Sequence, residues 1–96
     1  MQSARSTVSI DNDQVRVTTW SFEPGQRTGP HRHGLPYVVV PATGGQLRLE
    51  THDGVTSAQL VAGQPYFREA GAQHDVVNDG EEQLVFVEVE IKPPPQ

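Results

Sequence analysis

The stretch from Gly25 to Gly44, GQRTGPHRHGLPYVVVPATG, decides both the fold and the candidate chemistry of this chain. It places His31 and His33 directly after a turn rich in glycine and proline, and it continues into the apolar run 37–40. Residues two apart in a β-strand project from the same face, so the sequence predicts that both imidazoles point to one side. Two neutral imidazoles on one face suit a divalent transition metal.

A third histidine, His74, lies in a second glycine-containing stretch, AGQPYFREAGAQHDVVN, which runs from residue 62 to residue 78. We expect His31, His33 and His74 to offer three neutral nitrogen ligands to one ion, with open positions for water, dioxygen or substrate. Iron is the expected metal, and zinc, nickel, manganese and copper are the alternatives. His52, next to a turn at Asp53-Gly54, is expected to be an ordinary polar residue.

The composition limits the class of protein. With 96 residues, 34% of them hydrophobic, nine glycines and eight prolines, the chain is expected to form one β-rich domain and no helical bundle. It has no cysteine, which excludes disulfides and thiolate metal sites. A formal charge of -5 with no basic run argues against nucleic acid and anionic membranes as partners. No long apolar run or basic leader is present, so a cytoplasmic location is expected.

Short runs of alternating or β-branched residues, separated by turn signals, predict an antiparallel all-β domain of eight or nine strands. The expected strands lie near residues 8–10, 14–22, 37–40, 46–51, 55–61, 65–68, 76–77 and 84–91. The run 37–40 is interpreted as a strand buried on both faces or at an interface. A single domain is predicted over residues 1–96, with its core at 8–91 and loose termini at 1–7 and 92–96.

Two spaced motifs resemble those of the cupin superfamily. In the first, a glycine, a His-x-His pair, a fourth position and a second glycine fall at Gly25, His31, His33, Tyr37 and Gly44. In the second, the spaced positions fall at Gly63, Glu69, Gly71, His74 and Asn78. Every spacing agrees with the family. Two identities differ, since Tyr37 stands where the family has a glutamate ligand and Glu69 stands where it has a proline.

The resemblance implies a single-domain cupin, a jelly-roll β-barrel of six to eight strands. The sequences of the two stretches look most like those of small stand-alone cupins, some of which carry the label β-alanine degradation protein. This resemblance makes small carboxylic acids the expected ligands. The resemblance also implies a homodimer. The apolar run 37–40, which is unsuited to a solvated sheet edge, favours the same state.

Further residues are assigned candidate roles beside the histidines. Tyr37 shares the parity of His31 and His33, so its phenol is expected inside, as a hydrogen-bond donor to substrate or, as the less favoured alternative, a metal ligand. Arg48 and Arg68 are interpreted mainly as surface charges, with pairing to a substrate carboxylate as the functional alternative. Phe86 is expected in the core and at the pocket mouth. Glu69 is expected to be a solvated loop residue, with metal binding as its alternative.

Three functions remain open from the sequence. The first is a metal-dependent enzyme, foremost a non-haem iron dioxygenase acting on a small carboxylate or carbonyl compound, with isomerase or lyase chemistry at the same residues as its variant. The second is a binding or sensing module without turnover. The third is a barrel scaffold with a vestigial site. Three intact histidines favour the enzyme, whereas the lack of a general base other than Tyr37 or Glu69 argues against demanding proton transfer.

Overall fold

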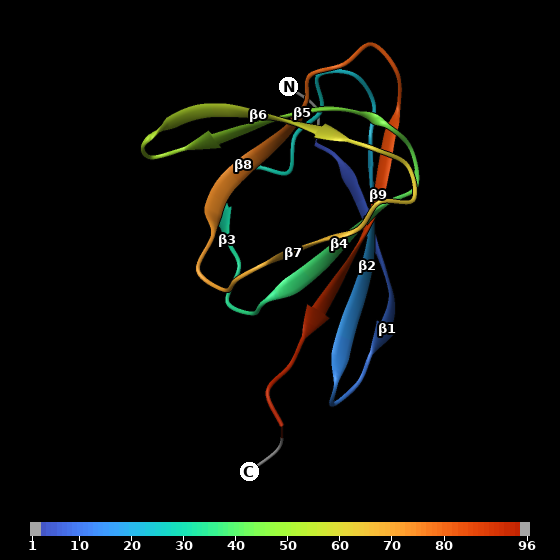
Figure 1. The fold of residues 1–96 in the computed structure, drawn as a ribbon, viewed down its shortest axis with the longest axis vertical. Helices are drawn as coiled ribbons and strands as arrows, with labels where there is room; N and C mark the ends of the chain where they lie inside the picture. The colour runs from blue at the N-terminus through green and yellow to red at the C-terminus, as the bar shows by residue number, and fades with distance from the viewer. Residues whose placement is uncertain (1–2, 95–96) are drawn as a thin grey trace.

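The structure, a computed structural model, describes residues 3–94, and these form strands and turns without helices (Figure 1). The strands are β1 Arg5–Asp11, β2 Val15–Phe22, β3 His31–Arg32, β4 Tyr37–Pro41, β5 Gly45–Thr51, β6 Gly54–Leu60, β7 Tyr66–Arg68, β8 Gln73–Asn78 and β9 Leu84–Ile91. Across residues 3–94, no helix is long and apolar enough to cross a membrane.

The strands form two sheets. One sheet has five strands in the order β1-β2-β9-β4-β7, and the other has four in the order β3-β8-β5-β6. Neighbouring strands pair antiparallel in both sheets. Figure 1 shows the chain passing repeatedly between the two sheets, as in a jelly roll. The predicted antiparallel all-β fold is therefore confirmed.

The core lies between the two sheets and is built from inward-facing residues of β2, β4, β5, β6, β8 and β9. Phe22 on β2 and Phe86 on β9 stack with their ring centres 5.5 Å apart. The buried cluster comprises Phe22, Tyr37, Val39, Leu47, Leu60, Val76, Leu84 and Phe86. On β2 the inward face is the one that carries Thr18 and Phe22. The alternation in the sequence shows two faces there, and the packing identifies the inner one.

The structure corrects the predicted termini. β1 begins at Arg5 and pairs with β2 along its length, so residues 5–7 are not loose. Near the other end, the backbone nitrogen of Lys92 donates to the carbonyl of Gln14, and its ammonium pairs with Asp11. The predicted loose ends also include residues 1–2 and 95–96, and these lie outside the residues that the structure describes.

The apolar strand β4 is an inner strand, because β9 pairs with one of its edges and β7 with the other. Its composition is therefore explained within one chain and needs no second subunit. This removes the sequence argument for a homodimer that was based on residues 37–40. The homodimer itself stays a prediction.

Asn78 links the two sheets through a buried amide. Its Nδ2 donates to the carbonyl oxygens of Phe22 at 3.1 Å and Glu82 at 2.8 Å, and its Oδ1 accepts from the backbone of Gly80. Asn78→Ala leaves these buried groups without partners, which we expect to lower the free energy of unfolding by roughly 2 to 4 kcal/mol. Urea denaturation of the metal-free protein measures this loss. Gln59→Ala, at an exposed position on β6, is the control, and an equal loss there would contradict the prediction.

Candidate metal centre

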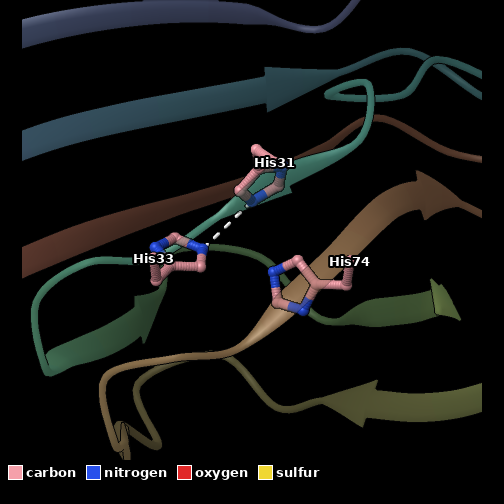
Figure 2. Close-up of side chains that lie close together, drawn as sticks. All are labelled: His31, His33 and His74. Atoms are coloured by element: carbon pink, nitrogen blue, oxygen red, sulfur yellow. Dashed lines mark hydrogen bonds between the residues drawn. The ribbon is translucent and has the colours of Figure 1, made fainter. Parts of the chain in front are cut away.

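The three predicted histidines come together inside the fold, as Figure 2 shows. His31 and His33 point the same way, with their Nε2 atoms 3.0 Å apart, and both rings meet the ring of His74 nearly at right angles. The candidate ligand atoms of all three lie within 4.8 Å of one another. Small side-chain rotations are enough to bring them to one ion, since metal–nitrogen bonds are about 2.0–2.1 Å long.

Backbone pairing places the histidines. β3 has only two residues, and within it His31 lies directly opposite His74 on β8. Just beyond β3, the nitrogen of His33 donates to the carbonyl of Ala72, and the nitrogen of Gly71 donates back to the carbonyl of His33. Gly71 has φ +102°, a conformation that favours glycine. The turn before β8 thus holds His33 against the strand that carries His74.

Local hydrogen bonds orient the ring of His31. Its Nδ1 lies 2.9 Å from the carbonyl oxygen of Gly29 and 3.1 Å from the hydroxyl of Thr28. A proton on Nδ1 donated to the carbonyl leaves Nε2 with a free lone pair that faces His33 and His74. The Thr28 hydroxyl also accepts from the nitrogen of Val76 on β8. The turn that carries His31 is therefore tied to the same strand.

An ion pair on the outer side of β8 fixes the same turn. The guanidinium of Arg27 contacts a carboxylate oxygen of Asp75 at 2.8 Å, and the other oxygen of Asp75 accepts from the nitrogen of Gly29. The Asp75 side chain is 8% exposed, so this charge-assisted pair is shielded from water. Asp75 follows His74 along the strand and points the opposite way. One strand therefore presents an imidazole inward and an anchor outward.

Burial keeps the inner imidazoles neutral. Desolvation first, and then the neighbouring His31, lower the pKa of His33 and of His74 to about 4. Neutral imidazole is the form that binds a metal, because its lone pair is free. Two of the three nitrogen ligands therefore need no deprotonation at neutral pH.

Tyr37 lies at the cluster, as its parity predicts. It is 2% exposed, and its ring stacks on that of His33 with centres 4.0 Å apart and planes 23° apart. Burial first, and then the nearby Glu88, raise the pKa of Tyr37 to about 12, so its side chain remains a neutral phenol. This disfavours the phenolate needed for metal binding. The role of Tyr37 as a hydrogen-bond donor to substrate stays a prediction.

Glu88 is a residue of the site that the sequence analysis did not select. It is 9% exposed, and its Oε2 lies 3.9 Å from Nε2 of His33, while Trp20 donates to its Oε1 at 3.1 Å. Burial raises the pKa of Glu88 to about 7. The available signal was its parity with Leu84 and Phe86 on β9, which places all three on one face. Glu90 has the same parity, so in the sequence this face carries two acidic residues and resembles a solvent-facing one.

The other candidate residues divide into two groups. Arg68 and Phe86 line a cavity of about 20 Å³ together with Tyr37, His74 and Glu88. Arg48 points away from it and pairs with Glu50 at 2.9 Å and with Asp79 at 2.8 Å. Arg48 is therefore placed by the structure in a surface ion-pair network and not with the histidines. Glu69 and His52 are exposed and lie outside the three-histidine group, as the main interpretation of each expected.

The cavity lined by Tyr37, His74 and Glu88 is small. Its volume of about 20 Å³ holds roughly one water molecule. His74 also borders an open groove of about 390 Å³, which is lined by Arg27, Glu50 and Asp75 among others. Arg68 is exposed, and its guanidinium carbon lies 5.4 Å from the ring centre of Tyr66. The inner cavity thus has room for about one water molecule, so a larger ligand enters it only if the lining side chains move. The guanidinium of Arg68 lies at its margin.

The donor set fits a divalent transition metal. Three imidazoles with converging nitrogens suit zinc, copper, iron and nickel, and no soft thiolate is present in the chain. His31, His33 and His74 would hold the ion, with the backbone contacts of Gly29 orienting His31. The predicted metal ligands are thus gathered in one place, and the identity of the metal stays a prediction.

Comparisons with known proteins agree with this architecture. No family model matches the sequence. Over 86 residues, 90% of each chain, it is 58% identical to the "Beta-alanine degradation protein BauB" of Pseudomonas aeruginosa. The crystal structure of a cupin domain from Bordetella pertussis Tohama I, 50% identical, superposes with a TM-score of 0.93 over 96% of both chains. The polyketide cyclase RemF of Streptomyces resistomycificus, 20% identical, superposes with a TM-score of 0.73 over 99% of this chain and 71% of its own, and shares the fold.

The stability of the metal-free protein is expected to fall on acidification from pH 7 to pH 5. In that range the unfolded chain protonates the imidazoles of His33 and His74, while the folded protein keeps both neutral. Glu88 acts in the opposite direction, because its raised pKa lets the folded protein take up a proton first. The net difference grows from near zero at pH 7 to about one proton at pH 5, where the slope reaches roughly 1.4 kcal/mol per pH unit. Urea denaturation at several pH values in the presence of a chelator measures this slope.

Glu88→Gln removes the opposing contribution and should steepen the slope to about two protons. Stability that stays constant or rises between pH 7 and pH 5 in the metal-free protein would contradict the burial of the two imidazoles as the cause.

Proposed function

Because this chain belongs to the cupin superfamily and to the family of the β-alanine degradation protein BauB, we propose that it is a metal-dependent enzyme, foremost a non-haem iron dioxygenase for a small carboxylate or carbonyl compound. The observation that carries the proposal is the convergence of His31, His33 and His74 in a cupin fold. Three protein ligands leave positions on an ion for reactants, as catalytic sites require. A bound iron would supply the activation of dioxygen and the polarisation of the substrate oxygen.

The residues around the histidines support a small, anionic substrate. Arg68 supplies a guanidinium at the margin of the cavity and can pair with a carboxylate through two hydrogen bonds. The phenol of Tyr37 stays protonated and is available to donate to a substrate oxygen. Phe86 and Val39 form apolar walls that exclude water from the reacting groups. The substrate is thus held by Arg68, oriented by Tyr37 and shielded by the core.

Metal-assisted isomerisation or lyase chemistry is the second candidate, and Glu88 favours it. These reactions need a base near the metal, and the sequence offered none except Tyr37 or Glu69. The Glu88 carboxylate lines the same cavity as His74, with its pKa raised to about 7. A carboxyl group with such a pKa is suited to proton transfer near neutral pH. The same site without turnover would act as a sensor of small acids.

Metal content tests the proposed site. Protein purified without added metal should carry close to one iron or other transition-metal ion per chain, and His31→Ala should lose most of it, because one of three ligands is removed. Elemental analysis measures the content, and His52→Ala, an exposed histidine outside the cluster, is the control. Less than about a tenth of the chains loaded, with no change in His31→Ala, would reject the metal site.

Oxygen consumption then separates the candidate functions. The iron-loaded protein should consume dioxygen with at least one member of a panel of small 1,3-dicarbonyl and thiol acids. Tight binding of these acids without consumption of oxygen or conversion to another product would favour sensing. Conversion without oxygen uptake would favour the isomerase or lyase.

Arg68 provides a test of substrate charge. Arg68→Gln should weaken the binding of acetoacetate about tenfold or more, because a charge-assisted hydrogen bond is lost. It should leave the binding of acetylacetone, the uncharged analogue, nearly unchanged. Calorimetry on the metal-loaded protein measures both dissociation constants. Arg48→Gln, which removes a guanidinium of the surface network, is the control. An equal effect on both compounds would contradict a role of Arg68 in recognising carboxylate.

A further inference from the structure

Glu88 is the one acidic side chain among the described residues that line the cavity beside the histidines. Its backbone is fixed in the middle of a sheet, since β9 pairs with β2 at Thr18 and with β4 at Val39. Burying a carboxylate is costly unless an opposite charge compensates it. Asp75, the buried acid on the outer side of β8, is compensated by Arg27. Glu88 has no such ion pair among the described residues: its Oε2 faces His33, and it lines the cavity that His74 also borders.

The two oxygens of Glu88 have different neighbours. Oε1 accepts a hydrogen bond of 3.1 Å from the indole nitrogen of Trp20. Oε2 lies 3.9 Å from Nε2 of His33, which is the same nitrogen that faces Nε2 of His31. Two atoms that bind one ion at 2.0–2.2 Å are separated by at most about 4.2 Å. The position of Oε2 is therefore compatible with sharing an ion with His33.

We propose that Glu88 is a fourth, anionic metal ligand, which binds through Oε2 beside His31, His33 and His74 while Trp20 holds Oε1. The inference rests on the proposed metal site. Three neutral imidazoles leave the full double charge of a divalent ion inside an apolar core, and one carboxylate halves it. The bond from Trp20 matches the pattern in which a hydrogen bond to a metal-binding group fixes its orientation. Trp20 is then a positioning residue.

Binding of Co²⁺ tests the proposal without reference to activity. The affinity of the metal-free protein is measured by competition with a chelator, and the visible absorption of bound Co²⁺ reports its ligands. Glu88→Gln should weaken binding by about 10- to 100-fold or more and shift the absorption bands. The new amide has the size of the carboxylate and keeps an oxygen for Trp20. Glu90→Gln, on the same strand but paired with Arg16, should change neither quantity.

Two further variants make each outcome decisive. Trp20→Phe keeps the carboxylate but removes the donor that orients it, so affinity should fall several-fold and the absorption should change. If metal-free Glu88→Gln shows no cooperative unfolding, and so is not properly folded, Trp20→Phe replaces it in the test. Full loss of binding in His31→Ala with unchanged affinity and spectrum in Glu88→Gln would overturn ligation by Glu88, and would leave it available as the base of the second candidate function. Unchanged binding in His31→Ala would instead reject the metal site itself.

Discussion

The pairing of the two-residue strand β3 with β8 is the constraint on which the candidate site depends. A strand this short contributes little pairing energy of its own, so the segment needs other anchors. They are supplied on both sides: Gly71 and Ala72 bind the backbone of His33, and Asp75 binds Arg27 and the turn before His31. All of these partners lie on β8 or in the turn that leads to it. The strand that carries His74 therefore also fixes the positions of the other two imidazoles.

This arrangement places polar groups where the core would otherwise be apolar. His33 and Glu88 are both less than a tenth exposed, and each occupies a position that a hydrophobic residue could fill. A domain of 96 residues has a small core, so every such position reduces the apolar area available for folding. The cost is limited because the imidazoles stay neutral and because Trp20 donates to the carboxylate. The gathering of these polar groups beside His74 in a small core is the physical argument for a metal site at this place.

Much of this could be predicted from the sequence, and the remainder has a physical reason. The alternation of apolar residues predicts strands, and strand parity predicts that His31 and His33 share a face, because both are local properties. The meeting of these two histidines with His74 was expected from the resemblance of the two spaced motifs to those of the cupins. Glu88 was missed because β9 carries apolar residues on both faces. Parity alone therefore does not show that the face with Glu88 is the inward one. Arg48 was a candidate by charge only. Its partner Glu50 lies two residues away on β5, and its partner Asp79 directly follows β8, whose register with β5 the sequence does not give. Pairings between distant strands are therefore the part that requires the structure.

Tyr37 shows how the chemistry of a barrel site can change without a change in its spacing. Its ring stacks on that of His33, with the ring centres 4.0 Å apart. The stacking fixes the imidazole, but a phenol with a pKa of about 12 contributes no negative charge at neutral pH. In a jelly roll, however, several strands contribute inward side chains to the same interior. β9 runs beside β4, with Glu88 opposite Val39, two residues from Tyr37 along the strand. Glu88 on the neighbouring strand β9 can thus reach the same cavity, while Tyr37, at the glutamate position of the motif, packs against His33.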